Sequence, residues 1–146
     1  MKANILMVCL GNICRSPLAE GILKSKLFST HFRIDSAGTA NFHIGKSPDY
    51  RSIKVAANHG IDISLQKARA FQIEDFNLFD KIYVMDRNNL KIIKQLAQTS
   101  DQLNKVSLIL ENGDVPDPYF GDYSDFKIVF GLLNEACEKI KFDLIN

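Results

Sequence analysis

The stretch from Ile5 to Leu23, ILMVCLGNICRSPLAEGIL, restricts the fold more than any other part of the sequence. It opens with a short apolar run over 4–8, which is typical of a strand buried on both faces. The run ends in a turn that holds two cysteines, a glycine and an arginine. Beyond the turn, Ser16 can cap a helix whose first position is Pro17, and apolar residues then recur at helical spacing. The stretch therefore predicts a strand, a tight loop and a helix.

Short apolar runs and helical patterns keep alternating along the rest of the chain. We expect strands at 32–37, 80–85 and 106–110, and helices at about 49–59, at about 87–98 and over the C-terminal residues. Residues 63–80 predict short helical pieces joined by turns. This alternation predicts an α/β fold, with a parallel sheet and helices on both faces. Ligands of such folds bind beyond the carboxyl ends of the strands, so the loops that follow the strands can share one site.

Composition narrows the class of protein. The 146 residues fit one domain over 1–146, and 46% hydrophobic and 24% charged residues are typical of a globular chain. A net charge of +1 gives no support for nucleic-acid binding. The apolar runs are too short for a membrane span, and no secretory pattern is present. Three cysteines without disulfide spacing fit a reducing compartment, so we expect a cytoplasmic protein with no membrane partner; export without a signal would leave no mark here.

The turn after the first strand has the spacing of a phosphate-binding loop. Cys9 and Arg15 are separated by five residues, and a loop of that length points its backbone N–H groups and a helix N-terminus into one concavity. Arg15 can add two parallel hydrogen bonds to a phosphate. The same field favours the thiolate of Cys9, a nucleophile facing the bound phosphorus. Gly11 and Asn12 suit unusual backbone conformations, and the Ser16 hydroxyl can donate to the thiolate.

Cleavage of a phosphate ester also needs a proton donor for the departing oxygen. Asp117, in the proline-braced segment DVPDPYF, follows a strand and can overhang the loop. Asp114 and Asp122 compete for this role, and acids in loops are usually solvated turn formers.

The second cysteine of the loop leaves two interpretations open. Cys14 can pack beneath the loop, or it can trap an oxidised Cys9 as a disulfide. A zinc site is disfavoured because no second Cys/His pair has ligand spacing, so we expect no metal and no cofactor.

The segments VCLGNICRSPLAE and DPY together closely resemble the low-molecular-weight protein-tyrosine phosphatases. The similarity continues through DSAGT, IGKSPDYRS and DFNLFDKIYVMD. The resemblance implies a four-stranded parallel sheet and a two-step mechanism that needs no metal. It makes Cys9 the nucleophile, Arg15 the phosphate-binding residue and Asp117 the general acid. The phosphate loop and its support would comprise Leu10, Gly11, Asn12, Ile13, Cys14, Ser16, Ser36 and Asp86, and the substrate cleft Phe42, Tyr119 and Phe120.

We therefore expect hydrolysis of phosphotyrosine in protein substrates through a cysteinyl-phosphate, by a monomer or a weakly self-associating chain. One alternative is a protein-arginine phosphatase, although that group tends to carry threonine at the position of Ile13. Another alternative is a phosphate-binding module without turnover. Arsenate reductases of similar fold use extra cysteines in mid-chain, and residues 60–100 contain none. Gln66 departs from the histidine that many members of the family carry.

Overall fold

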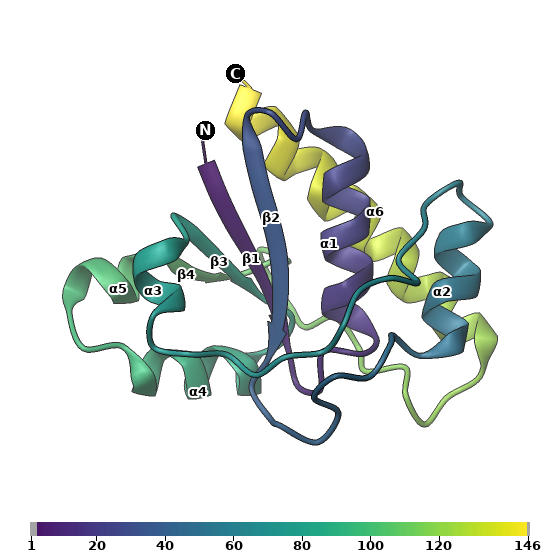
Figure 1. Cartoon of the computed structure of the whole chain (residues 1–146), viewed down its shortest axis with the longest axis horizontal. Coiled ribbons are helices and arrows are strands. Elements are labelled where there is room, and N and C mark those ends of the chain that lie inside the picture. The colour runs from purple at the N-terminus through teal and green to yellow at the C-terminus, as the bar shows by residue number, and fades with distance from the viewer. Residues whose placement is uncertain (1–2, 146) are drawn as a thin grey trace.

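A four-stranded parallel sheet forms the centre of the computed structural model, which describes residues 3–145 (Figure 1). Its strands are β1 (Ala3–Cys9), β2 (Phe32–Gly38), β3 (Lys81–Val84) and β4 (Val106–Leu108), in the order β2-β1-β3-β4. In the register, Ile5 of β1 lies opposite Ile34 on one side and Lys81 on the other. The predicted strands and their parallel arrangement are confirmed, with β3 and β4 shorter than expected.

Helices cover both faces of this sheet, as the alternating pattern predicts. Figure 1 shows α1 (Arg15–Lys26), α2 (Tyr50–Ala57) and α6 (Tyr123–Ile145) on one side. On the other side lie α3 (Asp75–Leu78), α4 (Arg87–Leu96) and α5 (Ser100–Asn104). The sequence interpretation missed α5, which begins where the Thr99 hydroxyl accepts the N–H of Gln102 as an N-terminal cap.

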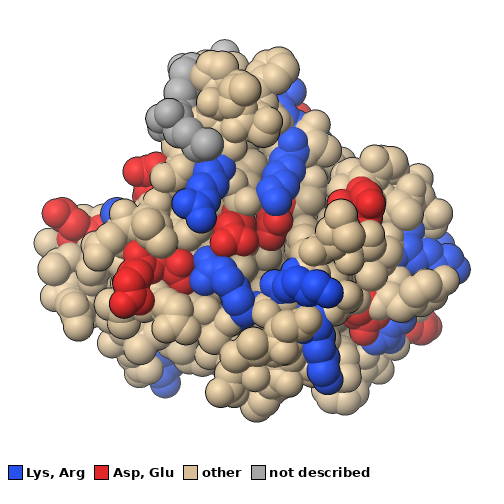
Figure 2. Space-filling model, in the orientation of Figure 1, with Lys and Arg blue, Asp and Glu red and all other residues tan. Residues whose placement is uncertain are grey.

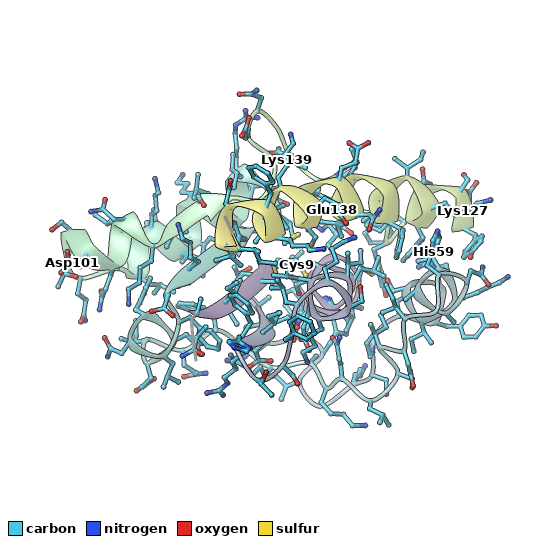
Figure 3. The ribbon with its side chains drawn as sticks, turned by 90° about the horizontal axis from the view of Figure 1, so that it is seen from above. Cys9, His59, Asp101, Lys127, Glu138 and Lys139 are labelled. Atoms are coloured by element: carbon cyan, nitrogen blue, oxygen red, sulfur yellow. The ribbon has the colours of Figure 1, made fainter. Side chains whose placement is uncertain are left out.

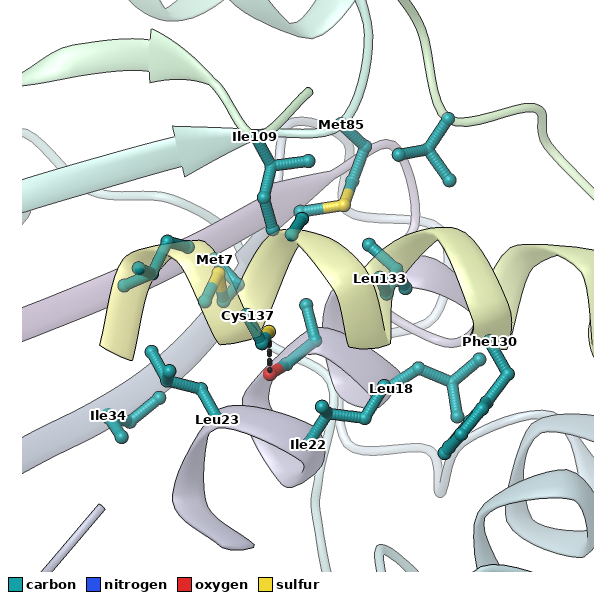
Figure 4. Packing of buried hydrophobic residues seen from close by; sticks show 14 of the residues in the cluster. Met7, Leu18, Ile22, Leu23, Ile34, Met85, Ile109, Phe130, Leu133 and Cys137 are labelled. Carbon is teal, nitrogen blue, oxygen red and sulfur yellow. Dashed lines mark hydrogen bonds between the residues drawn. The ribbon is translucent and has the colours of Figure 1, made fainter. Parts of the chain in front are cut away.

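β1 supplies both hydrophobic cores because alternate residues of a strand point to opposite faces. Ile5 and Met7 pack with residues of α1 and α6, whereas Leu6 and Val8 pack with residues of α3 and α4. In the first core, Cys137 of α6 faces α1 and its thiol donates to the carbonyl oxygen of Ala19 at 3.8 Å (Figure 4). The burial of β1 on both faces matches its nearly continuous apolar sequence.

The start of α1 corrects one expectation. We expected Ser16 to cap this helix, but α1 begins at Arg15, and Cys14 occupies the cap position without a side-chain cap bond. Ser16 is thus the second residue of the helix, and its hydroxyl lies against Cys9 and Asn12. The reason is that the phosphate loop turns directly into the helix, so the hydroxyl is used inside the loop.

The loops at the carboxyl ends of the strands are joined by backbone hydrogen bonds. The N–H groups of Thr39 and Ala40 donate to the carbonyl oxygens of Cys9 and Leu10, each at 2.9 Å, and tie the loop after β2 to the loop after β1. The N–H of Val115 donates to the Met85 carbonyl at 2.8 Å, which brings the loop after β4 beside the end of β3. These loops therefore meet at one edge of the sheet.

The surface carries charges of both signs. Figure 2 shows Lys and Arg side chains interspersed with Asp and Glu on the drawn face, in keeping with the net charge of +1. Among residues 3–145, no helix has the length and apolar character needed to cross a membrane.

Candidate active site

The loop after β1 is held closely against the end of β2. A Cβ at Gly38 would lie 2.8 Å from the carbonyl oxygen of Leu10 and 3.1 Å from the carbonyl carbon of Gly11. Both contacts are to backbone, which cannot move aside as a flexible side chain would. Gly38 therefore permits the close approach that shapes the outer wall of the loop.

Asn12 fixes the interior of the loop. It is the non-glycine residue with positive φ, at 57°, among the described residues, a conformation that asparagine tolerates better than most. Its buried amide donates to the Ser16 hydroxyl at 2.7 Å and to the Ser36 hydroxyl at 2.9 Å. Its Oδ1 accepts the backbone N–H of Arg69 at 3.0 Å. All three bonds hold a backbone conformation that is costly by itself.

The Cys9 thiol lies at the end of this hydrogen-bonded chain. Cys9, which is labelled in Figure 3, is only 2% exposed. Its Sγ lies 3.1 Å from the Ser16 Oγ. The Ser16 hydroxyl accepts an N–H from Asn12, and its own proton lies within reach of the sulfur and of the Ala37 carbonyl oxygen at 3.5 Å, so it can donate to Cys9. Such a donor stabilises negative charge on the sulfur atom, whether before attack or when sulfur departs.

Arg15 is buried beside the thiol with its guanidinium fixed from behind. Its Nη1 donates to Asp86 Oδ2 at 2.7 Å and to the Val115 carbonyl at 2.9 Å. Burial lowers the pKa of Arg15, but the charge of Cys9 and the hydrogen bond to Asp86 outweigh it, so that the pKa is raised overall. Asp86 also caps α4 through the N–H of Asn89 at 2.8 Å. The arginine is therefore a permanent, oriented cation.

Asp117 is the acid that the fold brings to the cavity. Its side chain is 42% exposed, its Oδ1 accepts the N–H of Tyr119 at 3.1 Å, and its Oδ2 lies 3.7 Å from Arg15 Nη2. The two competing acids are engaged elsewhere: Asp114 accepts the N–H of Arg87, and Asp122 accepts the N–H and hydroxyl of Ser124. Of the three candidates, Asp117 alone lines the cavity.

A cavity of about 200 Å³ lies over the phosphate loop. Phe42 and Phe120 form parts of its wall and are 69% and 95% exposed, so each ring has a free surface. The Tyr119 ring meets Phe120 edge to face, with centroids 4.9 Å apart. The full lining is Cys9, Leu10, Gly11, Ile13, Cys14, Arg15, Phe42, His43, Asp117, Tyr119 and Phe120. Behind this lining, Ser16 bonds Cys9 and Asp86 bonds Arg15. Asn12 also lies behind it and links Ser16 to Ser36.

Several residues at this site were missed by the sequence interpretation. His43 lines the cavity between Phe42 and Tyr119, with ring centroids 6.3 and 6.4 Å away. Glu20 is buried, and its Oε1 accepts the Ser36 hydroxyl at 2.6 Å, so Ser36 is oriented to accept from Asn12. The available signal for Glu20 was a carboxylate within the apolar pattern of PLAEGIL. No comparable signal marked His43, because a histidine in a loop is normally a surface residue.

Arg69 and Gln66 lie in the segment that approaches the loop from outside. The Arg69 guanidinium bridges Asp35 and Asp75 with bonds of 3.0 to 3.2 Å, which holds its backbone N–H against Asn12. Gln66 donates to the Pro17 carbonyl of α1 at 3.2 Å. The segment thus supports the loop mainly through Arg69.

Cys14 is a neutral thiol in this arrangement. Burial raises its pKa well above the ordinary value, and the nearby charge of Asp49 raises it further. The carbonyl oxygen of Cys14 accepts the hydroxyl of buried Ser52 at 3.3 Å, so the residue also ties the loop to α2. Its protective pairing with Cys9 stays a prediction. No cluster of three or more His, Cys, Asp or Glu within residues 3–145 is arranged to hold a metal ion.

Known proteins are similar to this chain in both sequence and fold. The family model described as low molecular weight phosphotyrosine protein phosphatase matches residues 4–145. The protein of that name from Dictyostelium discoideum is 38% identical, over 92% of this chain and 89% of its own length. The crystal structure of a protein tyrosine phosphatase from Entamoeba histolytica matches with a TM-score of 0.90 and 33% identity, over 97% of this chain and 96% of that one. Vibrio vulnificus Wzb, solved in complex with benzylphosphonate, matches with a TM-score of 0.89 and 28% identity, over 98% and 99%. The chain belongs to the family of low molecular weight phosphotyrosine protein phosphatases.

Proposed function

We propose that this protein hydrolyses phosphotyrosine in protein substrates through a cysteinyl-phosphate intermediate. One observation carries the proposal: a buried thiol, 3.1 Å from a buried serine hydroxyl, shares a cavity with a fixed arginine and a half-exposed carboxyl group. A receptor that only binds phosphate needs neither the thiol nor the acid. Membership of the family supports the same conclusion.

The first step transfers the phosphoryl group to the enzyme. The phosphate lies in the loop over 9–15, where backbone N–H groups, the α1 N-terminus and Arg15 bind its oxygens. The Cys9 thiolate attacks phosphorus and forms the S–P bond while the P–O bond to the tyrosine ring breaks. Asp117 gives its proton to the departing phenolic oxygen.

The second step returns the enzyme to its starting state. Asp117, now a carboxylate, takes a proton from water as that water attacks phosphorus. The S–P bond breaks, inorganic phosphate leaves, and the thiolate of Cys9 reappears. The Ser16 hydroxyl at 3.1 Å stabilises the sulfur as it departs.

The walls of the cavity support an aromatic substrate. Phe42, Tyr119 and Phe120 offer faces and edges against which a phenol ring can stack. The complex of Vibrio vulnificus Wzb with benzylphosphonate shows a structural relative that binds an aryl ligand of this kind. Ile13, which lines the cavity, favours phosphotyrosine over phosphoarginine in this proposal.

Three further properties belong to the proposal. The reaction needs no metal, because Arg15 and the loop N–H groups supply the positive charge that phosphate requires. The protein acts as a monomer or a weakly self-associating chain, and one chain supplies Cys9, Arg15 and Asp117 around the cavity. The cytoplasm suits three buried, free cysteines, of which one acts as the nucleophile.

The first experiment measures phosphate release from one peptide made in phosphotyrosine, phosphoserine and phosphoarginine forms, with a metal chelator present. We expect rapid release from the phosphotyrosine form alone and none by Cys9→Ser, which should still bind inorganic phosphate. Preference for phosphoarginine would overturn the substrate class. A folded protein that releases no phosphate from any form would be a binding module.

A further inference from the structure

Arg51, near the start of α2, reaches across to the loop that carries the proposed acid. Its Nη2 donates to the carbonyl oxygen of Tyr119 at 2.9 Å, and its Nη1 donates to that of Gly121 at 3.0 Å. The guanidinium also stacks over the buried Phe126 of α6, 4.3 Å from the ring centroid. The Arg51 side chain thus bonds two carbonyl groups of the loop that carries Asp117, here called the acid loop, and packs on the ring of Phe126.

Tyr119, whose carbonyl oxygen accepts from Arg51, is also the residue that orients Asp117. The backbone N–H of Tyr119 donates to Asp117 Oδ1 at 3.1 Å, while the carbonyl of the same residue accepts from Arg51. The Gly121 N–H donates to the Pro118 carbonyl at 2.9 Å and closes a turn that contains Tyr119 and Gly121, the two residues bonded by Arg51. A shift of this turn would therefore move the Asp117 carboxyl group with it.

The other end of Arg51 is fixed to the phosphate loop through Asp49. The guanidinium makes a two-pronged pair with Asp49, Nε to Oδ1 and Nη2 to Oδ2, both at 3.0 Å. The Asp49 N–H donates to the carbonyl oxygen of Ile13 in the phosphate loop at 2.8 Å. A short path of hydrogen bonds therefore runs from the phosphate loop through Asp49 and Arg51 to the acid loop.

We propose that Arg51 is a positioning residue that fixes Asp117 over the phosphate loop and so governs proton transfer to the departing oxygen. This inference rests on the proposed function. Asp117 needs such support because its carboxyl group is half exposed, in a loop with no strand or helix of its own. Misplacement of a catalytic group by about 1 Å can cost on the order of 100-fold in rate.

Arginine suits this task and lysine does not. The planar guanidinium presents five N–H groups in a fixed fork, so it can bind a carboxylate and two carbonyls at once. An ammonium at the same place keeps the positive charge but cannot make all of these bonds. Arg51→Lys therefore tests the hydrogen bonds of the guanidinium in a chain whose net charge is unchanged.

The experiment compares kcat/KM for a series of aryl phosphates whose leaving phenols range from strongly acidic nitrophenols to phenol itself. Acidic phenols leave without a proton, so their esters do not depend on the acid, whereas phenyl phosphate does. We expect Arg51→Lys and Arg51→Met to lose about 10- to 100-fold with phenyl phosphate and less than about 3-fold with the most acidic phenol. Asp117→Asn should show the same pattern, with a larger difference between the loss for phenyl phosphate and the loss for the ester of the most acidic phenol.

Two controls separate positioning from general damage. Inhibition by inorganic phosphate should stay unchanged in the Arg51 variants, which shows that the phosphate loop is intact. Lys54→Met removes another cation of α2, one that lies over Tyr123 at 4.6 Å, and should leave the series unchanged. An equal loss across the whole series, or no loss at all, would overturn the inference while wild-type activity still supports the proposed function. Wild-type protein inactive on every ester would overturn both.

Discussion

Asn12 shows how one side chain can hold a strained loop in place. A non-glycine residue in the left-handed region costs about 1 to 2 kcal/mol. Three hydrogen bonds, to Ser16, Ser36 and the Arg69 N–H, offset this cost, each worth about 1 kcal/mol when buried. The first of these bonds also holds the Ser16 hydroxyl, which lies 3.1 Å from the Cys9 sulfur. Stability of the loop and orientation at Cys9 therefore depend on one amide group.

Two variants at this position separate strain from bonding. Asn12→Gly and Asn12→Ala remove the same three hydrogen bonds, and only the glycine accepts φ of 57° without strain. We expect Asn12→Ala, which keeps the strain, to lower the free energy of unfolding by about 3 kcal/mol, and Asn12→Gly, which relieves it, to lower it by about 1 kcal/mol less. Urea unfolding measures both values. Equal stability of the two variants would contradict the strain argument.

At the scale of elements, the N-terminus of α2 joins parts of the site that are far apart in sequence. Asp49 caps this helix by accepting the N–H of Arg51 at 2.9 Å, and it pairs with the guanidinium of the same residue. Burial alone would raise the pKa of Asp49, but the bonds from Arg51 outweigh it and lower the pKa overall. The ionised form of Asp49 is thus stabilised by the bonds that it accepts from Arg51 in the folded state.

This lowered pKa predicts a pH-dependent contribution to stability. A carboxyl group with a lowered pKa in the folded state stabilises that state fully above its unfolded pKa, ordinarily 3.8, and loses the contribution as pH falls through the folded pKa. Asp49→Asn keeps a capping side chain but removes the charge. We expect it to lower the free energy of unfolding by about 1 to 2 kcal/mol near neutral pH.

Urea unfolding at a series of pH values measures this contribution. The difference between wild type and Asp49→Asn should shrink as the pH falls below about 4. Glu135→Gln, which alters an exposed carboxylate on α6, is the matched control. A difference that stays constant down to low pH would show that the charge pair contributes nothing.

The helices and strands follow closely from local sequence, and their exceptions have local causes. The apolar run of β1 and the end of the helix expected at about 49–59, just before Gly60 with its φ of +76°, were readable because each signal lies within a few residues. Ser16 was misassigned because the rule for caps assumes a free hydroxyl, and here the loop uses it. α5 was missed because its five residues are all outside the cores and give no apolar pattern.

At the scale of the whole molecule, the site depends on contacts that a linear pattern does not contain. The loop Cys-x5-Arg was visible in the sequence because its parts are adjacent. The hydrogen bond from Arg51 to Tyr119 joins residues that are 68 positions apart in the sequence, and the one from Ser36 to Glu20 joins residues 16 positions apart. Such pairs arise only when β1, β2 and the acid loop meet at one sheet edge. Ser36 and Tyr119 were assigned to the site through the family resemblance, whereas their partners Glu20 and Arg51 were missed.

The shared strand predicts that the chain unfolds as one unit. β1 contributes Ile5 and Met7 to one core and Leu6 and Val8 to the other, so neither core can form without it. Leu18→Ala alters the core under α1, and Ile93→Ala alters the core under α4; each side chain is fully buried. We expect each variant to lower the free energy of unfolding by about 2 to 5 kcal/mol.

Far-ultraviolet and tyrosine circular dichroism should then report the same unfolding midpoint in wild type and in both variants. This single transition would support one domain over 1–146. Two midpoints, with each substitution moving only one of them, would instead show two units on opposite faces of the sheet. One unit is the expected result because β1, which carries Cys9 at its end, is buried by both cores. Damage to either core should therefore disturb the phosphate loop.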